Sequence, residues 1–316
     1  MSVPDKQTFE TLTQARTVQN NTTQFSLFPD TIPNTPNLTA EYWLYSDLNK
    51  LFGPTLFPTS PNMDTHVWKN LLMPETPKSK HSKTITLQNA NYGFYSGHVA
   101  TTHHPYSLYG GQTFKNAADL QLSRYACWCL TRKNPELIFA RTYFLSPSIA
   151  PNTSYDTIRQ YATQFRRINL REQLKYYEKI LSGIIQKLDA GHSMLRNEMT
   201  RTFYYGYHES DLKDIYKIPT KQNDPISNYM GVASLIARIS ALRNTIDRFG
   251  KSYYKNIDTL RGILYEELTN QRVKMIQNTS RAPEQDMTPT PVSRAQSKLS
   301  KLEQTFIAQY ANTKIR

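Results

Sequence analysis

The amino-acid sequence predicts a mixed α+β protein, in which a small N-terminal domain of helices and strands precedes a mostly helical C-terminal domain. Three observations lead to this expectation. The chain has 316 residues, a length that suits two domains and additional tails. Apolar residues in its second half recur three and four residues apart, which is the spacing of packed helices. The stretch Pro74–Gly111 instead combines strand-like residues at Ile85 and Leu87 with Gly, Tyr and His, as is typical of strands and turns.

Composition narrows the classes of function. Lys and Arg outnumber Asp and Glu by 38 to 25, which gives a formal net charge of +13 at pH 7. The excess is spread along the chain after residue 38, so a basic folded surface is favoured over a basic tail. No apolar run approaches the roughly 20 residues of a membrane-spanning helix, and the N-terminus has no secretory pattern. Cys127 and Cys129 are too close in sequence to bridge each other. We therefore expect a cytoplasmic protein whose partner is a polyanion and not a membrane.

The N-terminal part is predicted to become ordered only after residue 38. Residues 1–38 are rich in Thr, Asn and Gln, which is typical of a flexible segment. An apolar cluster at Phe25–Phe28 either docks on the body or a partner or stays free. Thr39 is a suitable cap for a helix that ends at Gly53-Pro54. A second short helix, Met63–Met73, is expected to follow.

The stretch 92–113 combines Gly, Tyr and His, and a basic loop with three lysines precedes it. Aromatic residues near lysines are able to stack on bases while the ammonium groups meet phosphate. The alternative is a surface hairpin whose tyrosines pack on the domain. His98, His103 and His104 suggest a metal, but no Cys, Asp or Glu lies between His81 and Asp119 to complete a ligand shell. We expect neither a metal nor another cofactor.

The densest apolar run of the first half lies between Asp119 and Phe144. Its apolar residues recur at helical spacing, which predicts a buried helix over 117–131 with Asp119 near its N-terminus, where a negative charge is favourable. A turn at Lys133–Pro135 follows. The next segment, Glu136–Leu145, is either a short strand or the start of another helix.

The second half predicts three helices with apolar seams. Ser154 caps the first, and Asn169 with Glu172 resembles a further capping pair. The seam residues are Leu170, Leu174, Tyr177, Leu181, Ile184 and Leu188, then Val232, Leu235, Ile239, Leu242, Ile246 and Phe249, then Ile257, Leu260, Leu264 and Leu268. Seams this short favour packing within one chain, and a homodimer through the same faces is the alternative.

Two groups of basic residues are the predicted nucleic-acid-binding site. The first group is Arg166, Arg167, Arg171 and Lys175. The second group is Arg124, Arg132, Lys133 and Arg141. On a helix, residues 167, 171 and 175 would form a ridge that tracks phosphates. The alternatives are a solvated face partly neutralised by Glu172 and Glu178, and a structural Arg124 paired with Asp119 or Glu136.

Motifs of catalysis are lacking in the sequence. There is no Gly-rich phosphate loop, no G-x-S-x-G and no zinc-ribbon spacing, and no nucleophile–base pair follows from spacing. We therefore expect binding and no enzymatic activity. A metal-dependent nuclease is the alternative.

The segment Asp119-x-x-Leu122-Ser123-Arg124-Tyr125-Ala126-Cys127, followed by Thr142-Tyr143-Phe144, resembles the signature of the bacterial DNA damage-inducible protein D (DinD) family. That family shares its N-terminal domain type with phage antirepressors of the BRO and KilA group. The block Phe203–Pro219 and the proline-rich segment with the helix after it are similar to later parts of the family. The likeness covers about Thr39 to Glu303, and it departs from the family at Pro54, where an aromatic residue is expected.

After the flexible segment 1–38 that composition predicts, the resemblance implies a BRO-N-like α+β domain 39–150, a helical domain 151–280, and a proline-containing hinge with a terminal amphipathic helix at 281–316. It also implies a regulator of the DNA-damage (SOS) response or of a mobile element. Such a protein would bind single- or double-stranded DNA or modulate recombinase filaments on single-stranded DNA. A protein-interaction module without direct DNA contact is the competing function.

Overall fold

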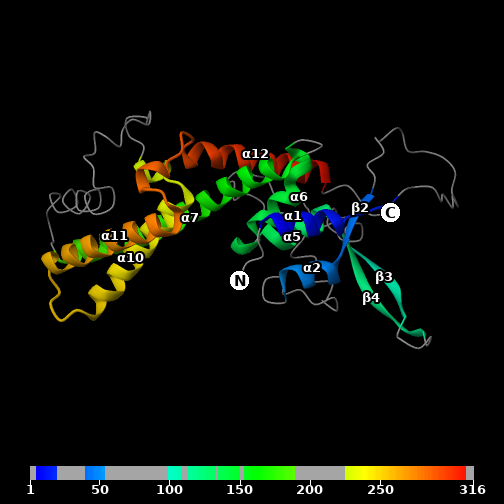
Figure 1. Cartoon of the computed structure of the whole chain (residues 1–316), viewed down its shortest axis with the longest axis horizontal. Helices are drawn as coiled ribbons and strands as arrows, with labels where there is room; N and C mark the ends of the chain where they lie inside the picture. The colour runs from blue at the N-terminus through cyan, green and yellow to red at the C-terminus, as the bar shows by residue number, and fades with distance from the viewer. Residues whose placement is uncertain are drawn as a thin grey trace, which may run out of the picture. The chain divides into compact units, whose positions relative to one another are not determined.

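The protein divides into two compact units in a computed structural model that describes residues 5–19, 40–53, 99–107, 113–132, 134–149, 153–188 and 225–310. The first unit comprises Met1–Ala162 and Ser300–Arg316, and the second comprises Thr163–Leu299. The boundaries of these units fall inside helices α7 (Tyr155–Leu188) and α12 (Val292–Tyr310). Figure 1 shows helices together with one small sheet, so the broad α+β class is confirmed.

The sheet belongs to the first unit and is antiparallel throughout. Its strands are β1 (Thr17–Gln19), β2 (Ala40–Leu44), β3 (Val99–Ser107) and β4 (Thr113–Ser123), in the order β1-β2-β4-β3. Strand β2 pairs with only the last three residues of β4, Gln121–Ser123. Among the described strands, β3 and β4 therefore continue beyond this point as a two-stranded ribbon (Figure 1). The described residues contain no group of three or more His, Cys, Asp or Glu that could hold a metal.

Part of the N-terminal segment is ordered, contrary to the prediction of a flexible 1–38. Helix α1 (Asp5–Gln14) buries Leu12, whose carbonyl accepts a hydrogen bond of 2.9 Å from Trp43 Nε1. The helix predicted from Thr39 instead begins at Tyr45 as α2 (Tyr45–Phe52), because β2 occupies the preceding residues. Its predicted end at Gly53 is confirmed, and the φ of +75° there is one that glycine adopts at little cost.

The predicted helix over 117–131 is wrong in its first half. Strand β4 runs to Ser123, and helix α5 (Arg124–Arg132) starts only there, with Ser123 Oγ accepting from the backbone N–H of Ala126 at 3.1 Å. Asp119 lies in β4 opposite Thr102, so it is not at a helix N-terminus. The segment Glu136–Leu145, for which a short strand and a helix were the two alternatives, is helical. The short 3-10 helix Pro135–Leu137 leads into α6 (Ile138–Leu145).

Helix α7 confirms one predicted cap and corrects the other. Ser154 Oγ accepts from the backbone N–H of Thr157 at 3.3 Å, as expected for an N-cap. Asn169 and Glu172 lie in the middle of α7, so they cap no helix. None of the described helices combines the length and the apolar character needed to cross a membrane.

The second unit is a helical hairpin with α7 packed on it. Helices α10 (Val232–Lys251) and α11 (Ile257–Thr279) run antiparallel, since Ser234 meets Met275 while Asn244 meets Glu267. The predicted seams share one core, and the most buried seam residues in it are Leu174, Leu235, Leu242, Leu260, Leu264 and Leu268. Packing of these seams within one chain is thus confirmed.

The predicted proline-containing hinge is bound to the second unit. A short 3-10 helix, Pro283–Gln285, leads into a bridge in which Gly231 N–H donates to Asp286 O and Thr288 N–H donates to Tyr229 O. The predicted terminal helix is present as α12. Several predictions lie outside the described residues, namely the Phe25–Phe28 cluster, the helix Met63–Met73, the strand at Ile85 and Leu87, and the block Phe203–Pro219.

Candidate nucleic-acid interface

The predicted basic ridge on α7 is not on the surface, because Arg167 points into the second unit. This side chain is 0% exposed. Its guanidinium donates to the backbone carbonyls of Met230 (2.9 Å), Asn228 (3.0 Å) and Thr290 (3.1 Å, from both terminal nitrogens), and to Gln164 Oε1 (2.8 Å). All five N–H groups of an arginine are engaged in this way. Arg167 is therefore a structural residue that has no donor left for a phosphate.

Arg171, one turn further along α7, is also buried. Its Nε donates to Asn228 Oδ1 and its Nη1 to Glu178 Oε2, both at 3.1 Å. Glu178 accepts a second charged bond, from Arg238 at 2.9 Å. Lys175 does face solvent with 53% exposure, and its ammonium pairs with Glu172 at 2.6 Å. Arg166 is half-buried.

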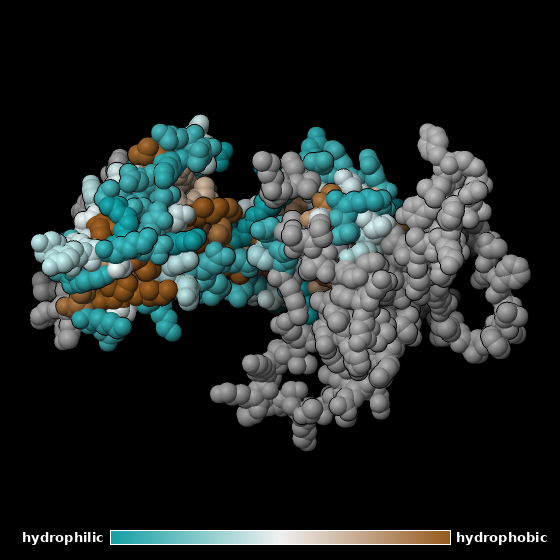
Figure 2. Space-filling model, turned by 90° about the horizontal axis from the view of Figure 1, so that it is seen from below, coloured by the Kyte–Doolittle hydropathy of each residue, from teal (hydrophilic) through white to brown (hydrophobic). Residues whose placement is uncertain are grey.

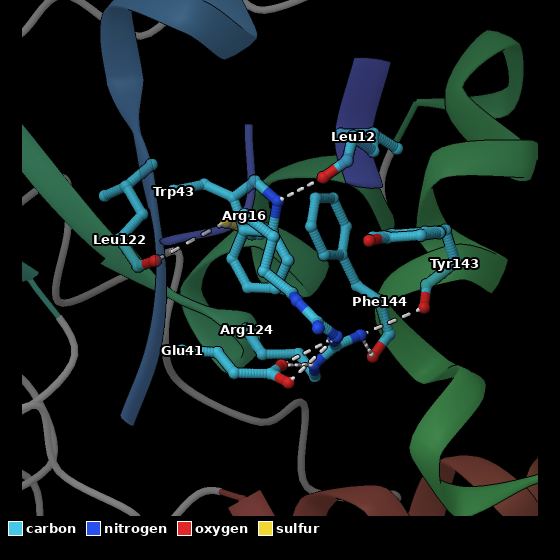
Figure 3. A network of polar contacts seen from close by, with 9 residues as sticks. Leu12, Arg16, Glu41, Trp43, Leu122, Arg124, Tyr143 and Phe144 are labelled. Atoms are coloured by element: carbon cyan, nitrogen blue, oxygen red, sulfur yellow. Dashed lines mark hydrogen bonds and ion pairs between the residues drawn. The ribbon is translucent and has the colours of Figure 1, made fainter. Parts of the chain in front are cut away.

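The second predicted group lies in the first unit, where Arg124 is buried against Glu41 (Figure 3). Arg124 donates through Nε and Nη2 to one oxygen of Glu41, at 2.9 and 2.6 Å, and its Nη1 reaches the carbonyls of Tyr143 and Phe144. The guanidinium carbon also lies 4.9 Å from the centre of the Trp43 ring. The structural alternative for Arg124 is thus the observed one, although its partner is Glu41 and not Asp119 or Glu136.

The rest of this group is also engaged in contacts within the first unit. Arg141 forms an ion pair with Glu303, and the Arg132 guanidinium lies 5.2 Å from the centre of the Trp128 ring. Lys133 lies outside the described residues. Of the predicted basic residues that the structure describes, Lys175 is the one that is exposed.

A different cluster of aromatic and basic residues is exposed where α10 and α11 meet. We call Lys251, Tyr253, Tyr254 and Lys255 the aromatic–basic tip. Tyr253 is 91% exposed and Tyr254 is 68% exposed. Their rings meet edge to face, with centroids 5.1 Å apart. Two adjacent large aromatic side chains therefore stand in water on the second unit.

The backbone of the tip is fixed on both sides. Lys255 Nζ donates to the carbonyls of Phe249 (2.8 Å) and Gly250, so a cation caps the C-terminal end of α10, where the helix dipole is negative. Asn256 Oδ1 accepts from the backbone N–H of Thr259 at 2.8 Å and caps the start of α11. Both tyrosine side chains in the turn between these caps stay largely exposed.

Acidic residues beside the tip are bound by arginines. Arg248 donates to Glu267 at 2.7 Å and to Glu266 at 2.8 Å, and these hydrogen bonds raise the pKa of the arginine. Burial by itself would raise the pKa of Glu267, but the bonds from Arg248 and Asn244 outweigh it, so that the pKa is lowered and the carboxylate stays charged. Arg261 pairs with Asp258 in the same way. Lys251 is exposed and has no ion-pair partner among the described residues.

A sequence signal for this tip existed. The segment Lys251-Ser-Tyr-Tyr-Lys255 stands between the glycine that ends one apolar seam and the isoleucine that begins the next. Two aromatic residues in such a short turn lie outside both seams, so they lack a partner helix to pack on. The predicted basic groups lie elsewhere in the chain and do not include this turn.

Comparison of the chain with known protein families, curated proteins and solved structures finds no match.

Proposed function

We propose that the protein is a non-enzymatic, cytoplasmic DNA-binding regulator, acting in the DNA-damage response or in the control of a mobile element. The observation that carries the proposal is the exposed aromatic–basic tip on a chain whose net charge is +13. Lysines meet phosphates, and exposed tyrosines offer faces on which bases stack. The resemblance of Asp119–Phe144 to the DinD family supports the biological setting, including an action on recombinase filaments.

A salt titration tests this proposal. Binding of a labelled oligonucleotide to the full chain is followed by fluorescence anisotropy, and log affinity is expected to fall linearly with log salt concentration. The change Lys251→Ala should weaken binding uniformly across DNA sequences and reduce the salt slope by about one, because one phosphate contact is lost. The same titration with the recombinase present tests whether its filament is a second target.

The matched control is Lys175→Ala, an exposed lysine of the same unit. Helix α7 meets α10 where Glu178 contacts Arg238, and the tip begins 13 residues further along α10, or about 20 Å at the helical rise. We expect this variant to bind as the original chain does. Equal weakening by both changes would place the contact with DNA along α7. An affinity that does not depend on salt concentration would contradict the proposal.

A second function, docking of a protein partner, is favoured by one observation. Four apolar side chains of α10 and α11 are exposed, namely Ile236, Tyr265, Val273 and Ile276. Figure 2 shows apolar residues gathered on the visible surface of this helical unit. Complexes formed through such a face would persist at high salt, which separates them from contacts with phosphate.

A further inference from the structure

We infer that Tyr253 and Tyr254 stack on unpaired bases, so that the aromatic–basic tip binds single-stranded DNA in preference to duplex DNA. This inference rests on the proposed DNA binding. It adds the form of DNA and the two side chains that recognise it.

The first argument is the exposure of the two rings. A tyrosine in a soluble protein usually buries most of its ring, because an exposed ring leaves apolar surface in water. Here two neighbouring rings are 91% and 68% exposed, although the flanking caps fix the backbone that carries them. A turn that is held at both ends and presents open rings suits a ligand with flat apolar faces, because less conformational entropy is lost on binding than from a free segment.

The second argument is the charge around the rings. Lys251 and Lys255 flank the tyrosine pair in sequence, and both are exposed. Of the acidic residues nearby, Asp258 is paired with Arg261, and Glu266 and Glu267 are paired with Arg248. Asp247, one turn before Lys251, is exposed, and the paired Asp258 and Glu266 are exposed as well. Lys251 supplies an exposed ammonium beside the rings, and Lys255, whose ammonium is bound at the end of α10, adds a second positive charge. Rings with positive charge on both sides match a strand in which bases alternate with phosphates.

The third argument separates single strands from duplexes. In a duplex the faces of the bases are covered by the neighbouring base pairs, and only their edges are accessible in the grooves. A tyrosine on a short turn therefore reaches the face of a base only when that base is unpaired. The stacking is tolerant of sequence, since every base has such a face.

The experiment uses the full chain and three labelled probes of equal length at low salt. They are an oligothymidylate, an oligomer of the same charge that lacks bases, and a duplex. We expect the oligothymidylate to bind most tightly. The double change Tyr253→Ala, Tyr254→Ala should weaken its binding about 5- to 100-fold, the loss that follows from base stacking, down to the level of the base-free probe. The double change to Phe keeps the ring faces and should retain the binding.

The control is Tyr176→Ala. Tyr176 lies on α7 in the same unit, is 62% exposed and meets Tyr177 edge to face at 5.4 Å, but it lies outside the tip. Its loss should leave binding of all three probes unchanged. Because all of these rings are exposed, the variants should keep the original melting temperature, which separates loss of binding from loss of fold.

Two results would overturn the inference and leave the proposed function standing. One is binding of the oligothymidylate that depends on salt but is unaffected by the double alanine change. The other is equal or tighter binding of the duplex or the base-free probe. If none of the three probes binds at low salt, the proposed function itself fails, and the inference fails with it.

Discussion

A single buried guanidinium joins three parts of the second unit. Arg167 on α7 is bound by carbonyl groups of residues 228 and 230, just before α10, and of residue 290, just before α12. Burial lowers the pKa of Arg167, and the carboxylate of Asp286 opposes that shift. A buried charge of this kind is costly to form but more costly to leave unpaired.

The first prediction concerns this side chain. Replacement by a residue of similar length, Arg167→Met, leaves the carbonyls of Asn228, Met230 and Thr290 without their donor. We expect the free energy of unfolding to fall by about 3–5 kcal/mol, as when one side of a buried polar pair is removed. Chemical denaturation followed by circular dichroism measures it.

The exposed neighbour Gln173→Ala on the same helix serves as the control and should change stability by less than about 0.5 kcal/mol. A lysine at position 167 should rescue only part of the loss, because an ammonium has no fork of five donors. If Arg167→Met proves as stable as the original chain, the structural role assigned to this arginine is wrong.

The sequence only partly predicts that Arg167 and Arg171 lie on the buried face of α7. Residues 167 and 171 continue the line of Leu174 and Leu181 at spacings of four, three and seven, so they share the buried face of α7. Charge led us to place them in solvent, since arginines are rarely buried. The carbonyl partners of Arg167 are about 60 and 120 residues away in sequence, and Arg171 binds the side chain of Asn228, 57 residues away. No local pattern reveals such distant acceptors.

At the scale of elements, the start of α10 depends on a residue from a distant segment. Asp286 Oδ2 accepts from the backbone N–H of Ser234 at 2.7 Å, and the backbone carbonyl of Asp286 accepts from Gly231 N–H at 2.6 Å. The carboxylate therefore caps α10 from outside the helix, where the dipole favours a negative charge. Gly231 leaves the room for it.

The second prediction compares two glycines of the helical hairpin. In Gly231→Ala, the new Cβ would lie 2.6 Å from Asp286 Oδ2 and closer still to its Oδ1 and Cγ, so the capping carboxylate must move. We expect a loss of about 1–2 kcal/mol, the size of a helix cap. In Gly262→Ala on α11, nothing lies within 4 Å of the new Cβ, and stability should rise by about 0.5–1 kcal/mol.

Thermal denaturation of both variants checks the pair, and the opposite signs are the result that matters. A stabilised Gly231→Ala would show that the Asp286 cap is dispensable.

Elements were predicted best where apolar spacing alone decides them. The seams of α7, α10 and α11 follow from leucines and isoleucines at helical spacing, and they are the core of the second unit. The junction of β4 and α5 was misjudged because Leu122 lies at helical spacing from Tyr125 and Ala126, although it belongs to the strand, opposite Trp43. Pairing with a strand about 80 residues earlier decides its conformation, and local spacing does not report such pairing.

At the scale of the whole molecule, the first unit is built from two separate parts of the chain. Residues 300–316 belong to it together with 1–162. Phe306 on α12 is 0% exposed, and its ring lies 5.5 Å from that of Trp128 and 6.3 Å from that of Tyr125. Arg141 and Glu303 add an ion pair between the same two parts.

The third prediction tests whether α12 completes the core of the first unit. Phe306→Ala removes a large ring from a buried aromatic cluster, and we expect the free energy of unfolding to fall by about 3–5 kcal/mol. Near-UV circular dichroism reports the loss of fixed packing around Trp128. The exposed neighbour Gln304→Ala should have no measurable effect, and equal behaviour of the two variants would show that α12 does not complete this unit.

The boundaries of the two compact units lie inside helices α7 and α12. The family resemblance implies a hinge and a separate terminal helix after residue 280. The structure instead binds that segment to the second unit through Asp286 and Thr288, and gives the last turns of α12 to the first unit. A helix that serves two cores has a continuous amphipathic pattern, so its sequence shows no break where one unit ends and the other begins.

Because residues 300–316 belong to the first unit, the order of synthesis determines when that unit is able to complete its fold. Phe306 emerges from the ribosome only after the whole of Thr163–Leu299 has been made. Trp128 and Tyr125 are translated much earlier, and they lack the Phe306 ring as a packing partner until then. A nascent chain that is cut short after the second unit therefore carries an open aromatic surface, of the kind that chaperones hold and proteases remove.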